Sequence, residues 1–295
     1  MNAIHRLLLI YILAFFCMCS NSDDAQTSEN VKEDWFDVDK VFDNTWAIEE
    51  SKSSQHNVSY LIAGSSRAIM FDTGSGENSG QDNTKITYKI LEITDLPVTL
   101  LLSHFHFDHN QNLHEFESIA FPEISFLKDR VGDDQIYSFS NEELFVGSRP
   151  TSVDINEWFP LETEIDLGSR KIEIINLPGH TDESIVIIDH DNKLTFTGDF
   201  IYNGTLFAFT SSDLRKYLSS INRFIDLVTE DYIFYGAHGR PLFTYDYLLD
   251  VQQLLNCVVN DKCADESSTN AFGYDATLYK SRENTTSLLL VHAGS

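Results

Sequence analysis

The sequence predicts a layered α/β protein. Short apolar segments bounded by Gly, Pro or Asn occur in two groups, and such segments are typical of buried strands. Each group is accompanied by longer segments in which apolar residues recur with helical spacing. The chain has 295 residues, 42% of them hydrophobic, which is enough for one large domain with a sizeable core. Elements in this order suggest two mixed sheets packed face to face with helices outside.

The first group of predicted strands precedes residue 103. Its strands are expected at Val41–Glu49, Asn57–Ala63, Ala68–Asp72 and Pro97–Leu102. A helix is expected at Asn83–Thr94, because Ile86, Ile90 and Ile93 would share one of its faces. Residues 123–168 are rich in acidic and aromatic residues without a regular period, so we expect an irregular insertion over the functional site.

The second group of predicted strands follows residue 170. Its strands are expected at Lys171–Leu177, Ser184–Asp189, Leu194–Gly198 and Tyr232–Tyr235. Helices are expected at Asp213–Val228, with Asp213 as its N-cap, and at Tyr245–Val259. Segments Phe272–Tyr279 and Ser287–Val291 are expected to form a closing hairpin.

The first residues predict an export signal at positions 1–19. Arg6 supplies a positive charge, and the apolar run Leu7–Met18 is shorter than the ~20 residues of a membrane-spanning helix. Cys19 is a candidate lipidation site, with plain cleavage as the alternative. Residues 20–34 are expected to form a flexible tether to one folded domain at residues 35–295. We therefore expect an exported bacterial protein, periplasmic or anchored to the outer membrane as a lipoprotein, with that lipid as its only membrane contact.

The charge of the chain excludes one class of partner. It carries 20 basic and 46 acidic residues, a formal net charge of −26, and such a surface repels polyanions. Nucleic acid is therefore not expected, because phosphate contacts need clustered Lys and Arg. Beyond the predicted signal only Cys257 and Cys263 remain, and export predicts a disulfide between them, with two free thiols as the alternative. No pattern indicates an oligomeric state.

The segment Ser103–His109 carries the densest group of metal-binding side chains in the chain. Three imidazoles and one carboxylate fall within six residues, at His104, His106, Asp108 and His109. They begin where a predicted buried strand ends, and the end of a strand in a sheet is a rigid place to hold a metal ion.

Three more candidate ligands follow predicted strands further along the chain. His180, Asp199 and His238 are each flanked by glycine, which allows a tight turn and a close approach of the backbone. Asp72 is a candidate carboxylate partner for one of the ligands. Together the seven ligands are too many for one catalytic ion and suit two that share a bridge. Nitrogen and carboxylate donors without thiolates suit zinc, and also iron or manganese.

The string His104–His109, with His180, Asp199 and His238 after it, resembles the metallo-β-lactamase-fold hydrolase superfamily. The resemblance extends over Trp35–Pro241 and implies a four-layer αββα sandwich with metals at one edge between the sheets. True β-lactamases of this fold carry Cys or Ser at the position of Asp199. An Asp there is similar to the glyoxalase II, lactonase and acyl-CoA thioesterase branch.

The same resemblance implies how the ligands are shared between two zinc ions. The first ion would be bound by His104, His106 and His180. The second would be bound by Asp108, His109 and His238. Asp199 would bridge the two ions.

The implied reaction is hydrolysis of a small carbonyl ester, thioester or lactone by a hydroxide that bridges the ions. Asp108 would also be catalytic by orienting that hydroxide, and Tyr202 would donate a hydrogen bond to the oxyanion, with a wall aromatic as its alternative role. The substrate is expected to be a small molecule, and export with an acidic surface argues against a CoA ester. Two alternatives remain: a β-lactam hydrolase, and an iron-dependent dioxygenase of the same fold.

Overall fold

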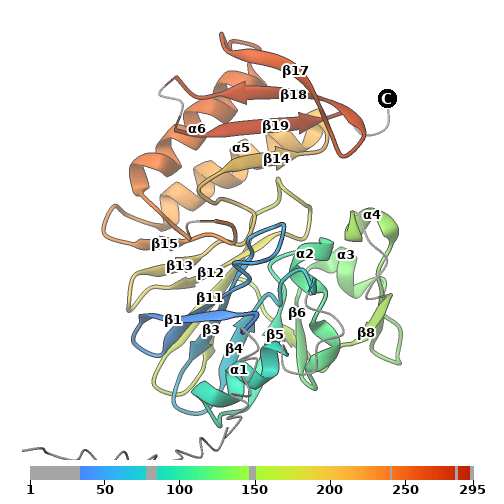
Figure 1. The fold of residues 1–295 in the computed structure, drawn as a ribbon, viewed down its shortest axis with the longest axis vertical. Coiled ribbons are helices and arrows are strands. Elements are labelled where there is room, and N and C mark those ends of the chain that lie inside the picture. Colours follow the sequence, from blue (N-terminus) through green and yellow to red (C-terminus); the bar gives the residue numbers. More distant parts are fainter. Residues whose placement is uncertain (1–33, 78–84, 146–150, 240, 283–284, 293–295) are drawn as a thin grey trace, which may run out of the picture. The chain divides into compact units, whose positions relative to one another are not determined.

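Two mixed β-sheets form the centre of the fold (Figure 1). The computed structural model describes residues 34–292, except residues 78–84, 146–150, 240 and 283–284. The predicted export signal, Cys19 and all of the predicted tether but Asp34 lie outside the described residues. Among the described residues, no helix is both long and apolar enough to cross a bilayer.

The first sheet has seven strands and the second has six. In spatial order the first contains β1 (Asp37–Phe42), β2 (Thr45–Glu49), β3 (Val58–Ala63), β4 (Ala68–Phe71), β5 (Val98–Leu101), β6 (Ile119–Pro122) and β9 (Glu157–Phe159). The second contains β10 (Glu164–Asp166), β11 (Lys171–Asn176), β12 (Ile185–Asp189), β13 (Leu194–Phe196), β15 (Ile233–Tyr235) and β16 (Leu242–Phe243).

Two smaller sheets and the helices complete the described elements. A four-stranded sheet contains β14 (Thr205–Ala208), β19 (Ser287–Val291), β18 (Tyr274–Lys280) and β17 (Glu266–Ala271), and β7 (Ile136–Ser138) pairs with β8 (Ser152–Asp154). The helices are α1 (Ile86–Ile93), α2 (Phe107–Asn110), the 3-10 helix η1 (Leu113–Glu115), α3 (Ser125–Lys128), α4 (Asn141–Leu144), α5 (Ser211–Leu227) and α6 (Tyr245–Val259).

The two large sheets bury their facing sides against each other. The ring of Tyr60 on β3 lies 5.0 Å from that of Phe196 on β13 and 5.6 Å from that of Tyr235 on β15. Helix α1 adds Ile86 and Ile90 to the hydrophobic cluster that contains the residues of the first sheet. Helices α5 and α6 cover the other face of the second sheet, so the predicted αββα order of layers is present.

Parallel strand pairs place the functional loops at one edge of the sheets. β4 runs parallel to β5, and β13 runs parallel to β15, with Phe196 opposite Tyr235. The carboxyl ends of parallel neighbours meet at the same edge, where α/β proteins commonly bind ligands. Asp199 lies three positions after Phe196, and His238 lies three positions after Tyr235. The two loops therefore begin side by side.

The four-stranded sheet was not predicted. Segments 272–279 and 287–291 do form an antiparallel pair, β18 and β19, but β17 and β14 extend it on both sides. Leu288 and Leu290 of β19 pack in the same core as α5 and α6. These helices therefore lie between two sheets, with apolar side chains of both sheets in the same hydrophobic cluster.

Three further expectations are corrected by the structure. The single strand Val41–Glu49 is two strands, because Asp43 and Asn44 form a turn in which Asn44 has a φ of 51°. The N-cap of α5 is Thr210, whose hydroxyl accepts from the N–H of Asp213, so Asp213 lies inside the helix. The region 123–168 is not wholly irregular, since β9 and β10 extend the two large sheets.

Candidate metal centre

The seven candidate ligands come together in two adjoining groups. The first group contains His104, His106 and His180, and the second contains Asp108, His109, Asp199 and His238. The donor atoms within each group lie within 4.8 Å of one another. All are buried except His238, which is slightly exposed. They follow β5, β11, β13 and β15, so the sheet edge supplies the whole set.

The first group is a triangle of imidazole nitrogens. His180 Nε2 lies 3.2 Å from His104 Nε2 and 3.0 Å from His106 Nδ1. Burial lowers the pKa of His104 and of His106 well below its usual value, and it also lowers the pKa of His180. These three rings are therefore neutral near pH 7, and each has a lone pair to offer a cation.

The second group alternates imidazoles and carboxylates. His238 Nε2 lies 2.9 Å from Asp199 Oδ1 and 3.5 Å from Asp108 Oδ2. His109 Nε2 lies 3.3 Å from Asp199 Oδ1 and 3.6 Å from Asp108 Oδ2. Burial alone would lower the pKa of both histidines, but the neighbouring carboxylates, Asp199 foremost and Asp108 with it, together outweigh burial and raise the pKa of each. The two imidazoles in turn hold the pKa of Asp199 well below its usual value, against the opposing effect of burial.

Asp199 is the residue that joins the two groups. Its Oδ1 lies among the donors of the second group, and its Oδ2 lies 3.6 Å from His180 Nε2 in the first. One carboxylate with an oxygen toward each group is the arrangement expected of a bridge. The sequence-based prediction placed Asp199 in this position.

Backbone and side-chain acceptors orient three of the histidines. The Nδ1 atoms of His180 and His238 lie 3.3 and 2.9 Å from the carbonyl oxygens of Phe207 and Gln55. His109 Nδ1 lies 2.9 Å from Asp72 Oδ2, as was expected of Asp72. With Nδ1 engaged outside, Nε2 is directed into the site, which is the usual way a protein orients a metal-binding histidine.

Asp72 also fastens the histidine loop to the sheet. Its Oδ1 accepts a 2.6 Å hydrogen bond from the backbone N–H of Ser103, and its backbone is left-handed, with a φ of 68°. Gly198 packs against the same serine, and a Cβ on it would lie 2.4 Å from Ser103 Cβ. This close approach accounts for the glycine before Asp199.

The donor set fits a pair of divalent cations. Ligand atoms around a tetrahedral ion with bonds of ~2.1 Å lie ~3.4 Å apart, and the donor distances above range from 2.9 to 3.6 Å. His109 Nε2 and Asp199 Oδ1 are buried without a hydrogen-bond partner. Buried polar atoms are rarely left without a partner, and a cation bound in the second group would satisfy both.

Two buried residues that support the site were not identified from the sequence. The side-chain amide of Asn57 lies 3.5 Å from Asp108 Oδ2. Glu183 Oε1 accepts a 3.3 Å hydrogen bond from the N–H of Phe105, inside the histidine loop. Neither residue stands in a metal-ligand motif, and only the packing of distant strands brings them to the loop.

Glu183 is expected to make stability depend on pH. Burial raises its pKa to about 7, so between the usual carboxyl range and pH 7 the folded protein holds a proton that the unfolded chain releases. The charged form therefore destabilises the fold above pH 7. At pH 8, Glu183→Gln is expected to be more stable than the parent. The difference in the free energy of unfolding between variant and parent should favour the variant more at pH 8 than at pH 5, by on the order of 2 kcal/mol. Urea unfolding of both metal-free proteins measures this, and a difference that is equal at the two pH values would contradict it.

Tyr202 lies at the site, but its hydroxyl is engaged elsewhere. The ring is 5.0 Å from that of His238, and the hydroxyl donates to the carbonyl oxygen of Thr205. Because that bond occupies the phenolic hydrogen, the geometry favours the wall role over the oxyanion donor. Catalysis by Tyr202 stays a prediction.

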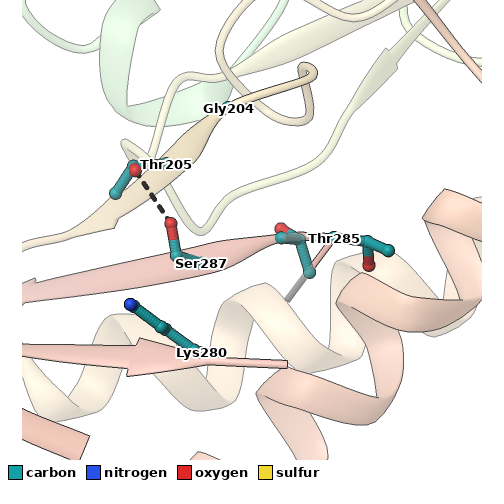
Figure 2. A pocket seen from close by; sticks show the side chains of 6 residues that line it. Gly204, Thr205, Lys280, Thr285 and Ser287 are labelled. Carbon is teal, nitrogen blue, oxygen red and sulfur yellow. Dashed lines mark hydrogen bonds between the residues drawn. The ribbon is translucent and has the colours of Figure 1, made fainter. Parts of the chain in front are cut away.

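A cavity of about 270 Å³ opens onto both groups of ligands. Its lining includes Asp108, His106, His180, Asp199, His238 and Tyr202, and the aromatic side chains Phe107, Phe145, Phe207, Phe209 and Phe272. Figure 2 shows another pocket of similar volume on the four-stranded sheet, where the hydroxyls of Thr205 and Ser287 are 2.8 Å apart. Its six described lining residues include Lys280 but no histidine or carboxylate, so the ligand chemistry belongs to the first cavity.

A family model described as the metallo-beta-lactamase superfamily matches residues 55–238. The acyl-coenzyme A thioesterase MBLAC2 of Gallus gallus is 27% identical over 185 residues, covering 57% of this chain and 66% of that protein, just under two thirds of its length. The hydroxyacylglutathione hydrolase GloC of Haemophilus influenzae is 28% identical over 196 residues, and the match covers 63% of this chain and 86% of that protein.

Solved structures show the same fold. A metallo-beta-lactamase from Pontibacter korlensis has a TM-score of 0.57 and 17% identity, and the match covers 75% of this chain and 99% of that one. At such low identity the likeness concerns the arrangement of sheets and helices alone.

Proposed function

Because the chain belongs to the metallo-β-lactamase superfamily and is one of its metal-dependent hydrolases, we propose that it hydrolyses a small ester, thioester or lactone with two zinc ions. The observation that carries the proposal is the pair of donor groups joined by Asp199. The three-histidine group would hold one ion and the group with Asp108 the other. Nitrogen and carboxylate donors without thiolate suit zinc.

The chain's own residues would position the reactants. Two bound divalent ions supply an activated water near neutral pH and a polarised carbonyl. Asp108 would orient the attacking water through its carboxylate, which the side-chain amide of Asn57 contacts. Burial of the ligands would exclude bulk water and strengthen these polar contacts.

The relatives support an acyl substrate. One is named an acyl-coenzyme A thioesterase and the other a hydroxyacylglutathione hydrolase, and both reactions hydrolyse a thioester. Asp199 at the bridge supports the ester and thioester branch over β-lactams. We therefore propose that this chain also hydrolyses an ester or thioester bond. We do not extend the leaving groups of the two relatives to it, since a net charge of −26 disfavours a polyanion such as CoA.

A substrate panel with defined metal content tests the proposal. We expect the purified protein to contain two zinc equivalents and to hydrolyse thioesters, lactones or aryl esters. A chelator should abolish turnover, and zinc should restore it. Turnover of β-lactams alone would contradict the ester assignment. Bound iron with oxygen consumption would identify the dioxygenase alternative.

We also propose that the enzyme acts after export to an oxidising compartment. Residues 1–19 carry the pattern of a signal segment. The disulfide between Cys257 and Cys263 supports this proposal, because such bonds persist outside the reducing cytosol. Fractionation of cells that express the full chain, with mass analysis of the mature N-terminus, would test export and lipidation at Cys19.

A further inference from the structure

Four phenylalanines form one wall of the metal-site cavity, which we call the aromatic wall: Phe145, Phe207, Phe209 and Phe272. They come from three distant segments, the end of α4, strand β14 with the residue that follows Ala208, and the turn between β17 and β18. Three segments that each place a phenylalanine at the same cavity suggest a shared binding task.

The rings contact one another around the cavity. Phe145 lies 4.8 Å from Phe209 and 4.8 Å from Phe272, the latter pair edge to face at 90°. Phe207 lies 5.7 Å from Phe272. Such pairs are favourable geometries for aromatic contact, so the wall is a continuous apolar surface.

Within the described part of the chain, the ring contacts between the wall and the ligands all involve one of the two donor groups. Phe145 and Phe209 lie 5.3 and 5.5 Å from the ring of His106, and Phe209 lies 5.8 Å from that of His180. Both histidines belong to the three-histidine group. On the other side, the residues next to His238 are Tyr202 and Gln55. The cavity therefore has an apolar side and a polar side relative to the ligands.

The side chains that line the cavity suit an uncharged ligand. None of the described residues that line it is a lysine or arginine, so the side chains around the aromatic wall offer no ion pair to a carboxylate or phosphate on the bound group. A chain with a net charge of −26 opposes an anionic acyl group further. Binding an apolar group needs only the aromatic surface.

The four-stranded sheet fixes the wall in place. Phe207 and Phe209 pack against Ala276, Leu289 and Val291 on β18 and β19. Phe272 has a left-handed backbone, with a φ of 54°, and Phe145 has a φ of 64°. A bulky residue rarely adopts this conformation, and residues that do so are concentrated at ligand sites. Phe272 also keeps 50% of its surface exposed, which an apolar ligand would cover.

We propose that the aromatic wall binds the uncharged, apolar acyl or aryl group of the substrate on the three-histidine side of the metal centre. This inference rests on the proposed function, because it identifies the acyl part of that substrate. A volume of about 270 Å³ is just below the ~300–1,000 Å³ typical of ligand pockets, so the group is of medium length. The leaving group lies on the side of Tyr202 and Gln55.

Binding without turnover tests the wall separately from catalysis. Calorimetry would compare butanamide with octanamide on metal-depleted protein, since each buried methylene is worth about a fourfold change in Kd. We expect octanamide to bind at least about tenfold more tightly than butanamide. Phe272→Ala, and more so the double variant Phe145→Ala with Phe272→Ala, should lose most of that preference.

Tyr274→Ala is the matched control. Tyr274 is 48% exposed, lies two residues from Phe272 and does not line the cavity, so its loss should leave the preference unchanged. When the metal-loaded protein hydrolyses aryl esters with acyl groups from acetyl to octanoyl, kcat/KM should show the same dependence on acyl-chain length. A succinyl ester should be hydrolysed more slowly than its uncharged equivalent.

The outcomes separate the two claims. If no ester is hydrolysed but octanamide is preferred and Phe272→Ala removes the preference, the wall stands and the proposed function fails. If esters are hydrolysed with equal rates at all lengths and the amides bind equally, the wall is refuted and the function stands. A preference unaffected by both phenylalanine variants would also overturn the assignment.

Discussion

Asp108→Asn is expected to lower kcat for ester hydrolysis by ~10²–10⁴-fold while the protein keeps both metal equivalents. Asn retains an oxygen donor, and the other three donors of that group are unchanged. What is lost is the negative charge that would orient the attacking water and accept its proton. Metal analysis of the variant, together with steady-state kinetics on its best ester, measures both effects.

Asp129→Asn is the control for this variant, because Asp129 is an exposed aspartate on the segment after α3, away from the cavity lining. Its kinetics and metal content should equal those of the parent. Unchanged turnover in Asp108→Asn would remove Asp108 from the mechanism. Loss of metal together with turnover would instead show that its role is ligation.

His180→Ala is expected to cost one metal equivalent and to lower kcat/KM by at least about 10³-fold, because a bound ion contributes several kcal/mol to stabilising charge in the transition state. The three-histidine group would be reduced to His104 and His106, and Asp199 would lose its neighbour at 3.6 Å. The second group keeps all four donors, so one ion should remain. Native mass spectrometry counts the ions directly.

His114→Ala provides the comparison. His114 is exposed on η1, five residues after His109, and belongs to neither donor group. The His114→Ala variant should bind two metal equivalents and retain full activity. Two equivalents bound to His180→Ala would contradict the ligand assignment, even if activity fell.

The positions of the candidate ligands along the chain could be predicted because each follows a strand whose pattern is local. The run before Ser103 and the runs before His180 and His238 are short and apolar, so their ends could be recognised. Parallel neighbours then bring strand ends to one edge, as β13 and β15 do for Asp199 and His238. The grouping of the donors agrees with the one implied by the family resemblance.

Other features depend on contacts that no local pattern carries. Glu183 approaches the histidine loop only because β12 packs beside it, and Asn57 reaches Asp108 across 51 residues of chain. The cap of α5 was assigned to Asp213 because Asp is a common N-cap, but Thr210, three residues earlier, begins the helix. Several residues in one short segment can cap a helix, and packing of the helix decides among them.

The sequence by itself determined the layered α/β class, the acidic character and the set of side chains able to bind metal, since these follow from composition and from spacing along single elements. Tertiary structure alone decided that Glu183 and Asn57 reach the histidine loop, that a four-stranded sheet covers α5 and α6, and that Phe145 and Phe209 lie beside His106. The aromatic wall depends on residues more than a hundred positions apart, such as Phe145 and Phe272. Burial of apolar surface that no single element can cover brings such residues together.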